Sequence, residues 1–333
     1  MKGKNIWPLP APQHIQLYPT FRCNQRCAFC FNDNASRARD LSAQEALNLI
    51  DILCDFGISD LDIMGGEPFL LPWMPSFLHA AIKEHIVVNI STNGSLPDVF
   101  EEFSGLSPGR INVGVSLEGS NPETHNRLTN SDNFEKAITS IRRIVSLGLD
   151  PIAKTVVSRR NRDDIQSVID LLKELGVTRY YLIHMDVFST EPSDRVNAMD
   201  FVEFMDFYGD TASHNTGIRI NRVNASCFEK HILPEGVRCA GGVRKLAIMP
   251  DGSAYPCNLF HHFPEFRLGN IFTDDFRDIW MNPKLAFFRI SEKNSCSRNQ
   301  CANHRACTGG CPAHGYFHAR DLDSIDIRCI SRP

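Results

Sequence analysis

Residues 20–31 read TFRCNQRCAFCF and carry three cysteines within eight residues. Three residues separate Cys23 from Cys27, and two separate Cys27 from Cys30. A structural zinc ion takes four ligands, usually from two separated pairs, and this triplet has no fourth Cys or His close by. A [4Fe–4S] cube takes one thiolate for each iron, so three thiolates leave one iron open to an outside ligand. A zinc knuckle, or three unrelated buried thiols, is the alternative.

Composition excludes several classes of protein. The chain has 333 residues, a formal net charge of -4 and a pI of about 6.3, so it lacks the basic footprint of a nucleic-acid-binding protein. Its N-terminus has no apolar run of signal-peptide length, and no stretch approaches the ~18 apolar residues of a membrane span. We therefore expect a cytoplasmic protein without nucleic-acid or membrane partners. In that compartment, twelve cysteines indicate metal binding rather than disulfides.

Strand-like and helix-like segments alternate along the first two-thirds of the chain. Six segments are predicted as strands: residues 14–18, 60–64, 86–90, 111–117, 151–157 and 180–185. This alternation predicts right-handed βαβ units and a parallel sheet. Six units cannot close an eight-stranded barrel, so the predicted fold class is α/β with a partial (β/α)6 barrel. We expect a lead-in at residues 1–13, this core at 14–218 and a second, cysteine-rich domain at 219–333.

The first helix has the clearest start signal. Ser42 and Glu45 form a capping box at its start. Farther along the chain, the polar stretch 189–195 is predicted to be a loop. The apolar face of the helix is predicted to comprise Ala46, Leu47, Ile50, Leu53 and Cys54. Cys54 is therefore interpreted as a core residue and not as a metal ligand.

Distinctive residues follow three of the predicted strands, where ligand sites gather in α/β barrels. Residues 64–68 read MGGEP, 91–94 read STNG and 116–119 read SLEG. The two glycines of the first motif permit close backbone approach, and Glu67 offers an acceptor to an ammonium group. Each motif taken alone is also compatible with a simple turn.

Together, the cysteine spacing and these motifs resemble the radical S-adenosylmethionine (SAM) superfamily. The resemblance implies that the open iron is chelated by the amino and carboxylate groups of SAM. It also implies that Phe29 packs beside the adenine and that Ser116 touches the SAM carboxylate or ribose. The implied cofactor-binding residues are Phe29, Gly65, Gly66, Glu67, Thr92, Asn93, Ser116 and Arg127.

The chain departs from the family pattern after the fourth strand. Glu118 stands where the family has Asp, and Asn126 replaces the Asp of an H-D-x-x-R segment. Arg127 lies one residue earlier than the Arg of that segment. Arg127 is therefore either a partner of the SAM carboxylate or a solvated surface arginine.

The last third of the chain resembles a SPASM domain, which adds two auxiliary [4Fe–4S] clusters. Four residues separate Gly252 from Cys257, and a Gly-Gly pair precedes Cys311. Two fully ligated clusters and the first triplet need eleven thiolates, which matches twelve cysteines less Cys54. The resemblance implies one cluster on Cys227, Cys239, Cys257 and Cys311, and another on Cys296, Cys301, Cys307 and Cys329.

Two alternatives stay open in this region. Cys227 is either a ligand or a thiol that donates a hydrogen atom, as in radical SAM epimerases. A zinc ribbon is the other possibility, because His304 and His314 accompany the cysteines. Four residues separate Cys296 from Cys301, where the family usually has two.

The resemblance implies an oxidoreductase that takes an electron from a flavodoxin- or ferredoxin-type reductant. It reductively cleaves SAM to a 5′-deoxyadenosyl radical, which abstracts hydrogen from a substrate. Sulfatase maturation is disfavoured because Asn258 follows Cys257, where those relatives have an Asp base, and an amide cannot take a proton at neutral pH.

Our leading hypothesis is maturation of a ribosomally synthesised peptide, although the first strand begins too early for an N-terminal peptide-recognition domain. The runner-up is oxidation or epimerisation of a small molecule such as an aminocyclitol. A non-catalytic iron–sulfur electron carrier is the alternative from another class.

Overall fold

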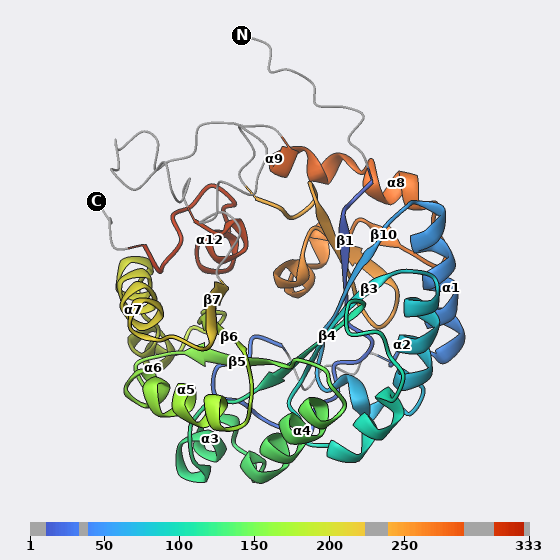
Figure 1. Ribbon diagram of the computed structural model, residues 1–333. Coiled ribbons are helices and arrows are strands. Elements are labelled where there is room, and N and C mark those ends of the chain that lie inside the picture. The colour runs from blue at the N-terminus through green and yellow to red at the C-terminus, as the bar shows by residue number, and fades with distance from the viewer. Residues whose placement is uncertain (1–10, 33–38, 224–238, 290–309, 330–333) are drawn as a thin grey trace.

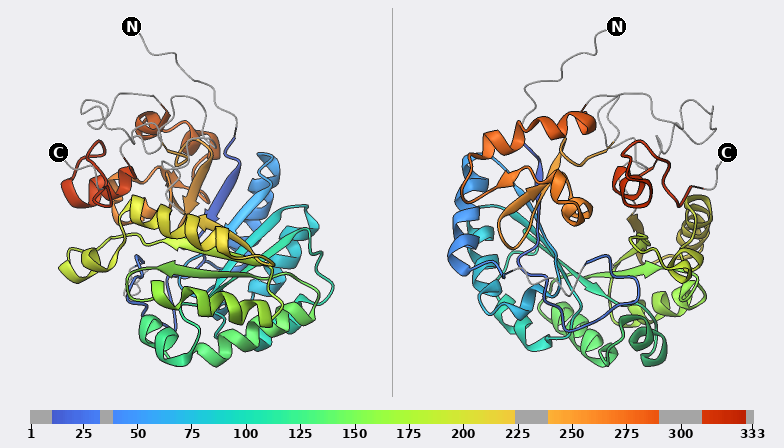
Figure 2. Two further views of the ribbon diagram at one scale, coloured as in Figure 1. Left: turned by 60° about the vertical axis from the view of Figure 1, so that its left-hand side comes forward. Right: turned by 180° about the vertical axis from the view of Figure 1, so that it is seen from behind.

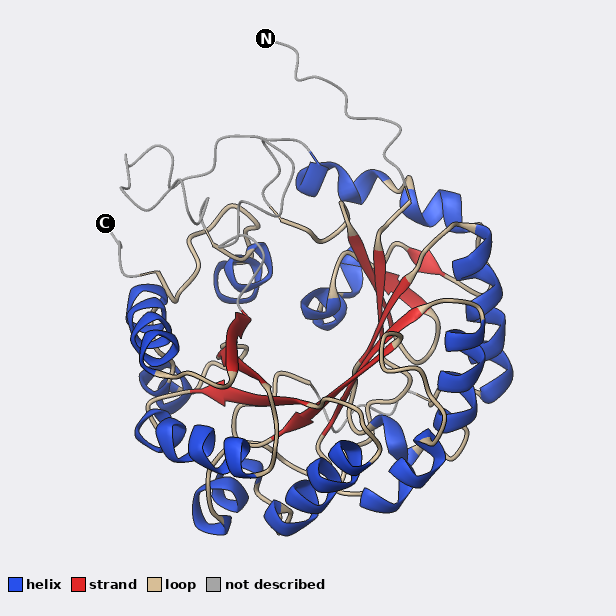
Figure 3. Ribbon diagram, in the orientation of Figure 1, coloured by secondary structure: helices blue, strands red, loops and turns tan. Residues whose placement is uncertain are grey.

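The computed structural model describes residues 11–32, 39–223, 239–289 and 310–329. Its ten-stranded sheet is bent into an open arc with most of the helices on the outer side (Figures 1 and 3). The strand order is β10-β9-β8-β1-β2-β3-β4-β5-β6-β7. Strands β8 and β1 to β7 run parallel to one another, whereas β9 and β10 are antiparallel to their neighbours.

The strands are β1 (His14–Leu17), β2 (Asp60–Ile63), β3 (Val87–Thr92), β4 (Ile111–Ser116), β5 (Ile152–Val157), β6 (Arg179–His184), β7 (Arg219–Val223), β8 (Lys245–Ile248), β9 (Ser253–Tyr255) and β10 (Gly269–Asn270). The α-helices are α1 (Ala43–Asp55), α2 (Met74–Lys83), α3 (Pro122–Thr129), α4 (Phe134–Ser146), α5 (Ile165–Glu174), α6 (Pro192–Asn197), α7 (Phe201–His214), α8 (Phe276–Trp280), α9 (Ala286–Arg289) and α12 (Pro312–Ala319). The short 3-10 helices are η1 (Pro68–Leu70), η2 (Pro97–Phe103), η3 (Arg162–Asp164), η6 (Asn258–His262), η7 (Pro264–Phe266) and η8 (Pro283–Leu285).

The predicted partial α/β barrel is confirmed, and the sheet extends beyond its six predicted strands. Strand β7 adds to β6 at one edge, and β8 adds to β1 at the other. The sequence of β7, RINRV, is short and mostly polar, which is why periodicity missed it. Strands β8 to β10 come from residues 219–333, so this segment completes the same sheet. The proposed domain division stays a prediction.

Two local predictions were wrong. Leu47 is 44% exposed and Cys54 is exposed; the buried residues of α1 are Ala46, Leu49, Ile50 and Leu53. These recur at the three- and four-residue spacing that one helix face requires, and Cys54 lies beyond the edge of that face. The predicted loop at 189–195 contains the start of α6, where proline occupies the first helical turn, a favourable place for it.

Alternation along the strands separates an apolar outer face from a polar inner face. In β3, Val88 and Ile90 are fully buried in the core, whereas the side chain of Asn89 bonds across the inner face to neighbouring strands. Its Nδ2 donates to Asp62 Oδ1 on β2 at 2.9 Å, and Asn112 Nδ2 on β4 donates to Asn89 Oδ1 at 2.9 Å. The inner face is therefore organised by hydrogen bonds rather than by apolar packing.

The C-terminal segment docks on the barrel through a buried charged cluster. Arg328 Nη2 donates to Asp326 Oδ2 at 2.8 Å, and Arg328 Nη1 donates to Asp186 Oδ1 at 2.9 Å, just beyond β6. Burial alone would raise the pKa of Asp326, but Arg328 and His314 outweigh it and hold that pKa well below its usual range. Figure 2 shows that α12, which carries His314, lies beside the open side of the arc. Within the described residues, no helix has the length and apolarity needed to cross a membrane.

Replacing Arg328 with Met tests this docking. The change leaves the Asp326 carboxylate, which is 0% exposed, without its cation, and breaking a buried pair in this way costs about 3–5 kcal/mol. We expect the free energy of unfolding to fall by that amount in anaerobic denaturant titrations. The control is Arg142→Met at an exposed position of α4. Equal unfolding midpoints for the two variants would contradict the assignment.

Candidate active site

A cavity of about 210 Å³ opens at the carboxyl ends of the central strands. It is lined by the cysteine loop after β1, the loop after β2, and the ends of β3 to β6. The residues that surround it are Tyr18, Cys23, Gln25, Cys27, Phe29, Cys30, Phe31, Asn32, Met64, Gly65, Gly66, Ser91, Thr92, Asn93, Ser116, Glu118, Thr129, Val156, Ile183 and Asp186. The structure thus brings the three loop cysteines together with six of the eight predicted cofactor-binding residues.

Backbone hydrogen bonds hold the cysteine loop against the loop after β2. Gly66 N donates to Thr20 O at 2.9 Å, and Glu67 N donates to Arg22 O at 2.8 Å. On its other side, Ala28 N donates to Leu128 O at 2.9 Å. The loop is therefore fixed from both sides by backbone groups.

The two glycines of the MGGEP motif are required by this contact. A Cβ at Gly66 would lie 1.9 Å from Arg22 O, and one at Gly65 would lie 2.4 Å from Thr20 O. Gly65 also has a φ of +132°, which residues with a side chain rarely adopt. The sequence predicted close backbone approach here, and the structure identifies the approaching partner as the cysteine loop itself.

Glu67 lies behind the cavity wall and does not line it. The side chain is 1% exposed. Its Oε1 accepts from Thr92 Oγ1 at 2.9 Å, and its Oε2 accepts from Asn93 N at 2.7 Å. Burial raises the pKa of Glu67 to about 7 against these hydrogen bonds. In this geometry Glu67 ties the loop after β2 to the end of β3, and direct contact with an ammonium group stays a prediction.

Arg127 also lies away from the cavity, exposed on α3. Its predicted contact with the SAM carboxylate therefore has no support from its position.

Glu118 lines the cavity at the end of β4. Its Oε2 accepts from Val156 N at 2.9 Å, and burial raises its pKa to about 8.

The loop cysteines are close enough to influence one another. Burial raises the pKa of Cys27, and the nearby Glu118, Cys30 and Cys23 raise it further. Asn93 Nδ2 lies 3.8 Å from Cys23 Sγ. Among the described residues, no three His, Cys, Asp or Glu side chains converge where a single metal ion could be held. A [4Fe–4S] cube does not need such convergence, because each thiolate binds a different iron.

Two buried polar atoms of the cavity have no partner in the described part of the protein. They are Nε2 of Gln25, whose side chain is 4% exposed, and Oδ1 of Asn32. An unpaired buried polar atom costs about 1–3 kcal/mol. A polar ligand could therefore accept a hydrogen bond from the Gln25 nitrogen and donate one to the Asn32 oxygen. The residues fit a cofactor that carries both kinds of group. Sequence reasoning missed both residues, because nothing in their spacing distinguishes them from ordinary loop residues.

A second group of cysteines lies in the C-terminal third. Cys239, Cys257 and Cys311 are buried. Burial raises the pKa of Cys257 to about 12, and the nearby Cys239 and Cys311 contribute to the increase. These are three of the four ligands predicted for one auxiliary cluster. Of the remaining predicted ligands, Cys329 is half-buried; Cys227, Cys296, Cys301 and Cys307 lie outside the described residues.

A hydrogen bond connects the two cysteine groups. Asn258 Nδ2, in the residue after Cys257, donates to the hydroxyl oxygen of Tyr18 at 3.0 Å. Tyr18 is fully buried and lines the cavity. This pair of side chains thus links the cavity wall to the residue that follows Cys257.

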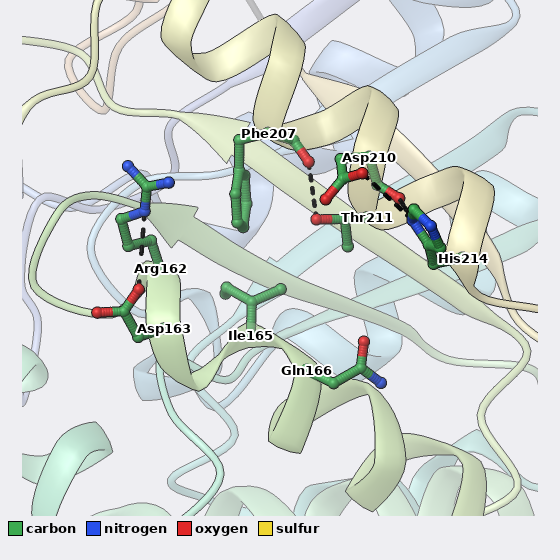
Figure 4. A pocket seen from close by; sticks show the side chains of 8 residues that line it. All are labelled: Arg162, Asp163, Ile165, Gln166, Phe207, Asp210, Thr211 and His214. Atoms are coloured by element: carbon green, nitrogen blue, oxygen red, sulfur yellow. Dashed lines mark hydrogen bonds and ion pairs between the residues drawn. The ribbon is translucent and has the colours of Figure 1, made fainter.

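Another hollow, of about 390 Å³, lies on the outer helical layer between α5 and α7. Figure 4 shows its lining, which includes Arg162, Gln166, Phe207 and His214. It shares no residue with the cavity at the strand ends and contains no cysteine, so we assign the chemistry to the strand-end cavity.

Comparison with known families agrees with this assignment. Residues 17–172 match the radical SAM superfamily. This part of the chain is a radical SAM domain. Residues 239–312 match SPASM, an iron–sulfur cluster-binding domain. The protein is therefore a radical SAM enzyme whose cofactors are SAM and [4Fe–4S] clusters, including auxiliary clusters in the SPASM domain, as predicted.

Relatives of this radical SAM enzyme span nearly all of its length. The AdoMet-dependent heme synthase of Methanosarcina barkeri is 25% identical over 97% of each chain. The mycofactocin maturase MftC of Mycolicibacterium smegmatis is 26% identical over 97% of this chain and 83% of its own. The names of these two relatives indicate different reactions, so the similarity alone does not specify the substrate.

Solved structures show the same fold. SuiB of Streptococcus suis bound to S-adenosylmethionine superposes with a TM-score of 0.81 at 19% identity, covering 96% of this chain and 77% of SuiB. SuiB bound to the precursor peptide SuiA gives a TM-score of 0.80 at 17% identity, covering 96% and 75%.

Replacing Gly66 with Ala tests whether the glycine contact builds the cluster site. The new methyl group would meet Arg22 O and push the cysteine loop away, so the SAM-binding cluster should assemble poorly. We expect anaerobically reconstituted protein to lose the iron of one cluster and to bind SAM at least tenfold more weakly. The matched control is Gly109→Ala, where an added Cβ meets nothing within 4 Å. Wild-type iron content and SAM affinity in the Gly66 variant would refute this account.

Proposed function

We propose that this enzyme matures a ribosomally synthesised peptide by abstracting a hydrogen atom and forming a crosslink or another oxidised product. The observation that carries this proposal is the superposition on SuiB bound to a precursor peptide, over 96% of this chain. The name of the mycofactocin maturase is further support for a maturation reaction. Asn258, in place of a carboxylate after Cys257, favours other products over sulfatase maturation.

We assign the metal ligands as the sequence predicted them. Cys23, Cys27 and Cys30 hold the SAM-binding cluster and leave one iron for SAM. Cys227, Cys239, Cys257 and Cys311 hold one auxiliary cluster, and Cys296, Cys301, Cys307 and Cys329 hold the other. The burial and proximity of Cys239, Cys257 and Cys311 support the first of these auxiliary sets.

The proposed reaction is balanced in electrons. The cluster on Cys23, Cys27 and Cys30 would pass one electron from a flavodoxin- or ferredoxin-type reductant to SAM, whose cleavage to methionine and a 5′-deoxyadenosyl radical would supply the group that takes a hydrogen atom from the peptide. To form an oxidised product, the peptide radical would lose one proton to solvent and one electron, which an auxiliary cluster on the C-terminal cysteines would accept. The Tyr18–Asn258 hydrogen bond supports this order, because it links the cavity wall to the residue that follows the buried Cys257.

A small molecule is the second candidate substrate, modified by oxidation or epimerisation. The observation that favours it is the heme synthase similarity, which covers 97% of both chains. The cavity of about 210 Å³ is the one assigned to the cofactors, so its size does not separate the two candidate substrates.

Deuterium transfer separates the candidates. Reduced, reconstituted enzyme is incubated with SAM and a deuterated candidate peptide encoded beside its gene, and 5′-deoxyadenosine is analysed by mass spectrometry. We expect deuterium in 5′-deoxyadenosine and a mass loss in the peptide. Transfer from a deuterated small metabolite, with none from the peptide, would overturn the proposal in favour of the second candidate. No SAM cleavage with every cluster intact would favour an electron carrier.

Cys227→Ala separates the two roles of that residue. As a ligand, Cys227 completes an auxiliary cluster, so the variant should lose that cluster's contribution to the reduced electron paramagnetic resonance spectrum. Ala substitution of the exposed Cys54 is the control and should leave all clusters in place. Intact clusters with an altered product in the Cys227 variant would show a hydrogen donor instead.

A further inference from the structure

Asp326 contacts the backbone of two cysteines that we propose as auxiliary ligands. Its Oδ2 accepts from Cys311 N at 3.0 Å, and its backbone carbonyl oxygen accepts from Cys329 N at 2.9 Å. Cys311 and Cys329 are assigned to different auxiliary clusters, and Asp326 itself is fully buried. One buried residue therefore holds a proposed ligand of each cluster by a hydrogen bond.

The chain leaves a dedicated space for this carboxylate at Gly310, the residue before Cys311. Gly310 has a φ of +80°, and a Cβ there would lie 2.2 Å from Asp326 Cβ. Because the aspartate side chain is short and buried, it could not swing away from such an atom. Any other residue at this position would therefore push Asp326 off the Cys311 amide. This contact gives the second glycine of the Gly-Gly pair a physical role.

Arg328 binds both oxygens of the same carboxylate. Its Nε donates to Asp326 Oδ1 at 3.1 Å, and its Nη2 donates to Oδ2 at 2.8 Å. Its Nη1 donates to Asp186 Oδ1 at 2.9 Å, and Asp186 lines the cavity. A chain of charged hydrogen bonds thus runs from the cavity wall through Arg328 and Asp326 to the backbone of Cys311.

The charges of this chain of residues are poorly solvated. The side chains of Asp326 and Arg328 are buried, and that of Asp186 is largely buried. The fully buried imidazole of His314 completes the group, with its Nδ1 3.2 Å from Arg328 Nη2. Because salt and water screen buried charges much less than exposed ones, each of these charges acts strongly on Cys311.

We propose that Asp326 positions Cys311 and, together with Arg328, sets the reduction potential of the auxiliary cluster that Cys311 would hold. Reduction adds one electron to a cluster, which a nearby carboxylate disfavours and a nearby guanidinium favours. Charge and hydrogen bonding around the ligands are the means by which a protein tunes such a potential. Asp326 and Arg328 are positioning residues. The inference rests on the ligand assignment proposed above and does not depend on the substrate.

Redox titrations followed by electron paramagnetic resonance test this tuning. They use full-length, anaerobically reconstituted protein in which Cys23, Cys27 and Cys30 are replaced by Ala, so that only the auxiliary clusters contribute. Asp326→Asn removes a negative charge while nearly keeping the shape of the side chain. We expect the midpoint potential of one auxiliary cluster to become more positive. Arg328→Met removes a positive charge and should shift the same potential in the negative direction.

The control is Asp321→Asn, the same change at an exposed position of the same segment, which should leave both potentials unchanged. Iron content checks that each variant keeps its clusters. If Arg328→Met loses a cluster, Asp186→Asn replaces it: this change removes a charge farther from Cys311 and should cause a smaller positive shift. Shifts of Asp326→Asn and Arg328→Met in the same direction, or no shift in Asp326→Asn, would indicate a purely structural role and overturn the proposal.

Cys311→Ala in the same background separates the tuning from the ligand assignment on which it rests. We expect this variant to lose the cluster whose potential Asp326→Asn moves. If Cys311→Ala keeps both auxiliary clusters, the ligand assignment is wrong and the tuning proposal falls with it. If the cluster is lost but Asp326→Asn leaves its potential unchanged, the ligand assignment stands and the tuning proposal alone is overturned.

Discussion

The contact between two backbone segments, the cysteine loop and the loop after β2, is the constraint on which the site depends. Gly66 has no room for even a methyl group, since Arg22 O would lie 1.9 Å from it. The same segment continues into Glu67, whose buried carboxylate holds the end of β3. A thiol loop, a glycine turn and a strand end are thereby fixed relative to one another. Bringing the two backbone segments this close at the glycines is unfavourable by itself. The backbone hydrogen bonds between the two loops, which position the cysteines, compensate for it.

The second organising feature is the way the C-terminal third completes the barrel. Strand β8 pairs with β1, and the buried Arg328 joins the last described segment to Asp186 at the cavity edge. Asn258 bonds to Tyr18 from the other side. Asn258, the residue after Cys257, thereby links the buried C-terminal thiols to Tyr18 in the cavity wall. This arrangement suits a reaction in which an electron leaves the substrate close to where a hydrogen atom was removed.

Much of this could be predicted from the sequence, because the signals are local. Cysteine spacing and the motifs at three strand ends lie within short stretches, and parallel strands bring their carboxyl ends together. What the sequence could not supply depends on long-range packing. The amide nitrogen of Gln25 is left without a hydrogen-bond partner only once the loop is buried. Lys154 reaches Ser91 only because Gly114 has no side chain in the way. Cys54 faces solvent because the buried face of α1 is centred nearer to Leu49 than the sequence predicted.

The central claim is that three thiolates hold a cluster with one iron open to SAM. Electron–nuclear double resonance on the reduced enzyme, with SAM carrying ¹³C in its carboxylate and ¹⁵N in its amine, tests this claim most directly. The account predicts hyperfine coupling from both labels to the cluster, and loss of that coupling when Cys27 is replaced by Ala. An unchanged cluster spectrum on addition of SAM, with neither label coupled, would contradict it.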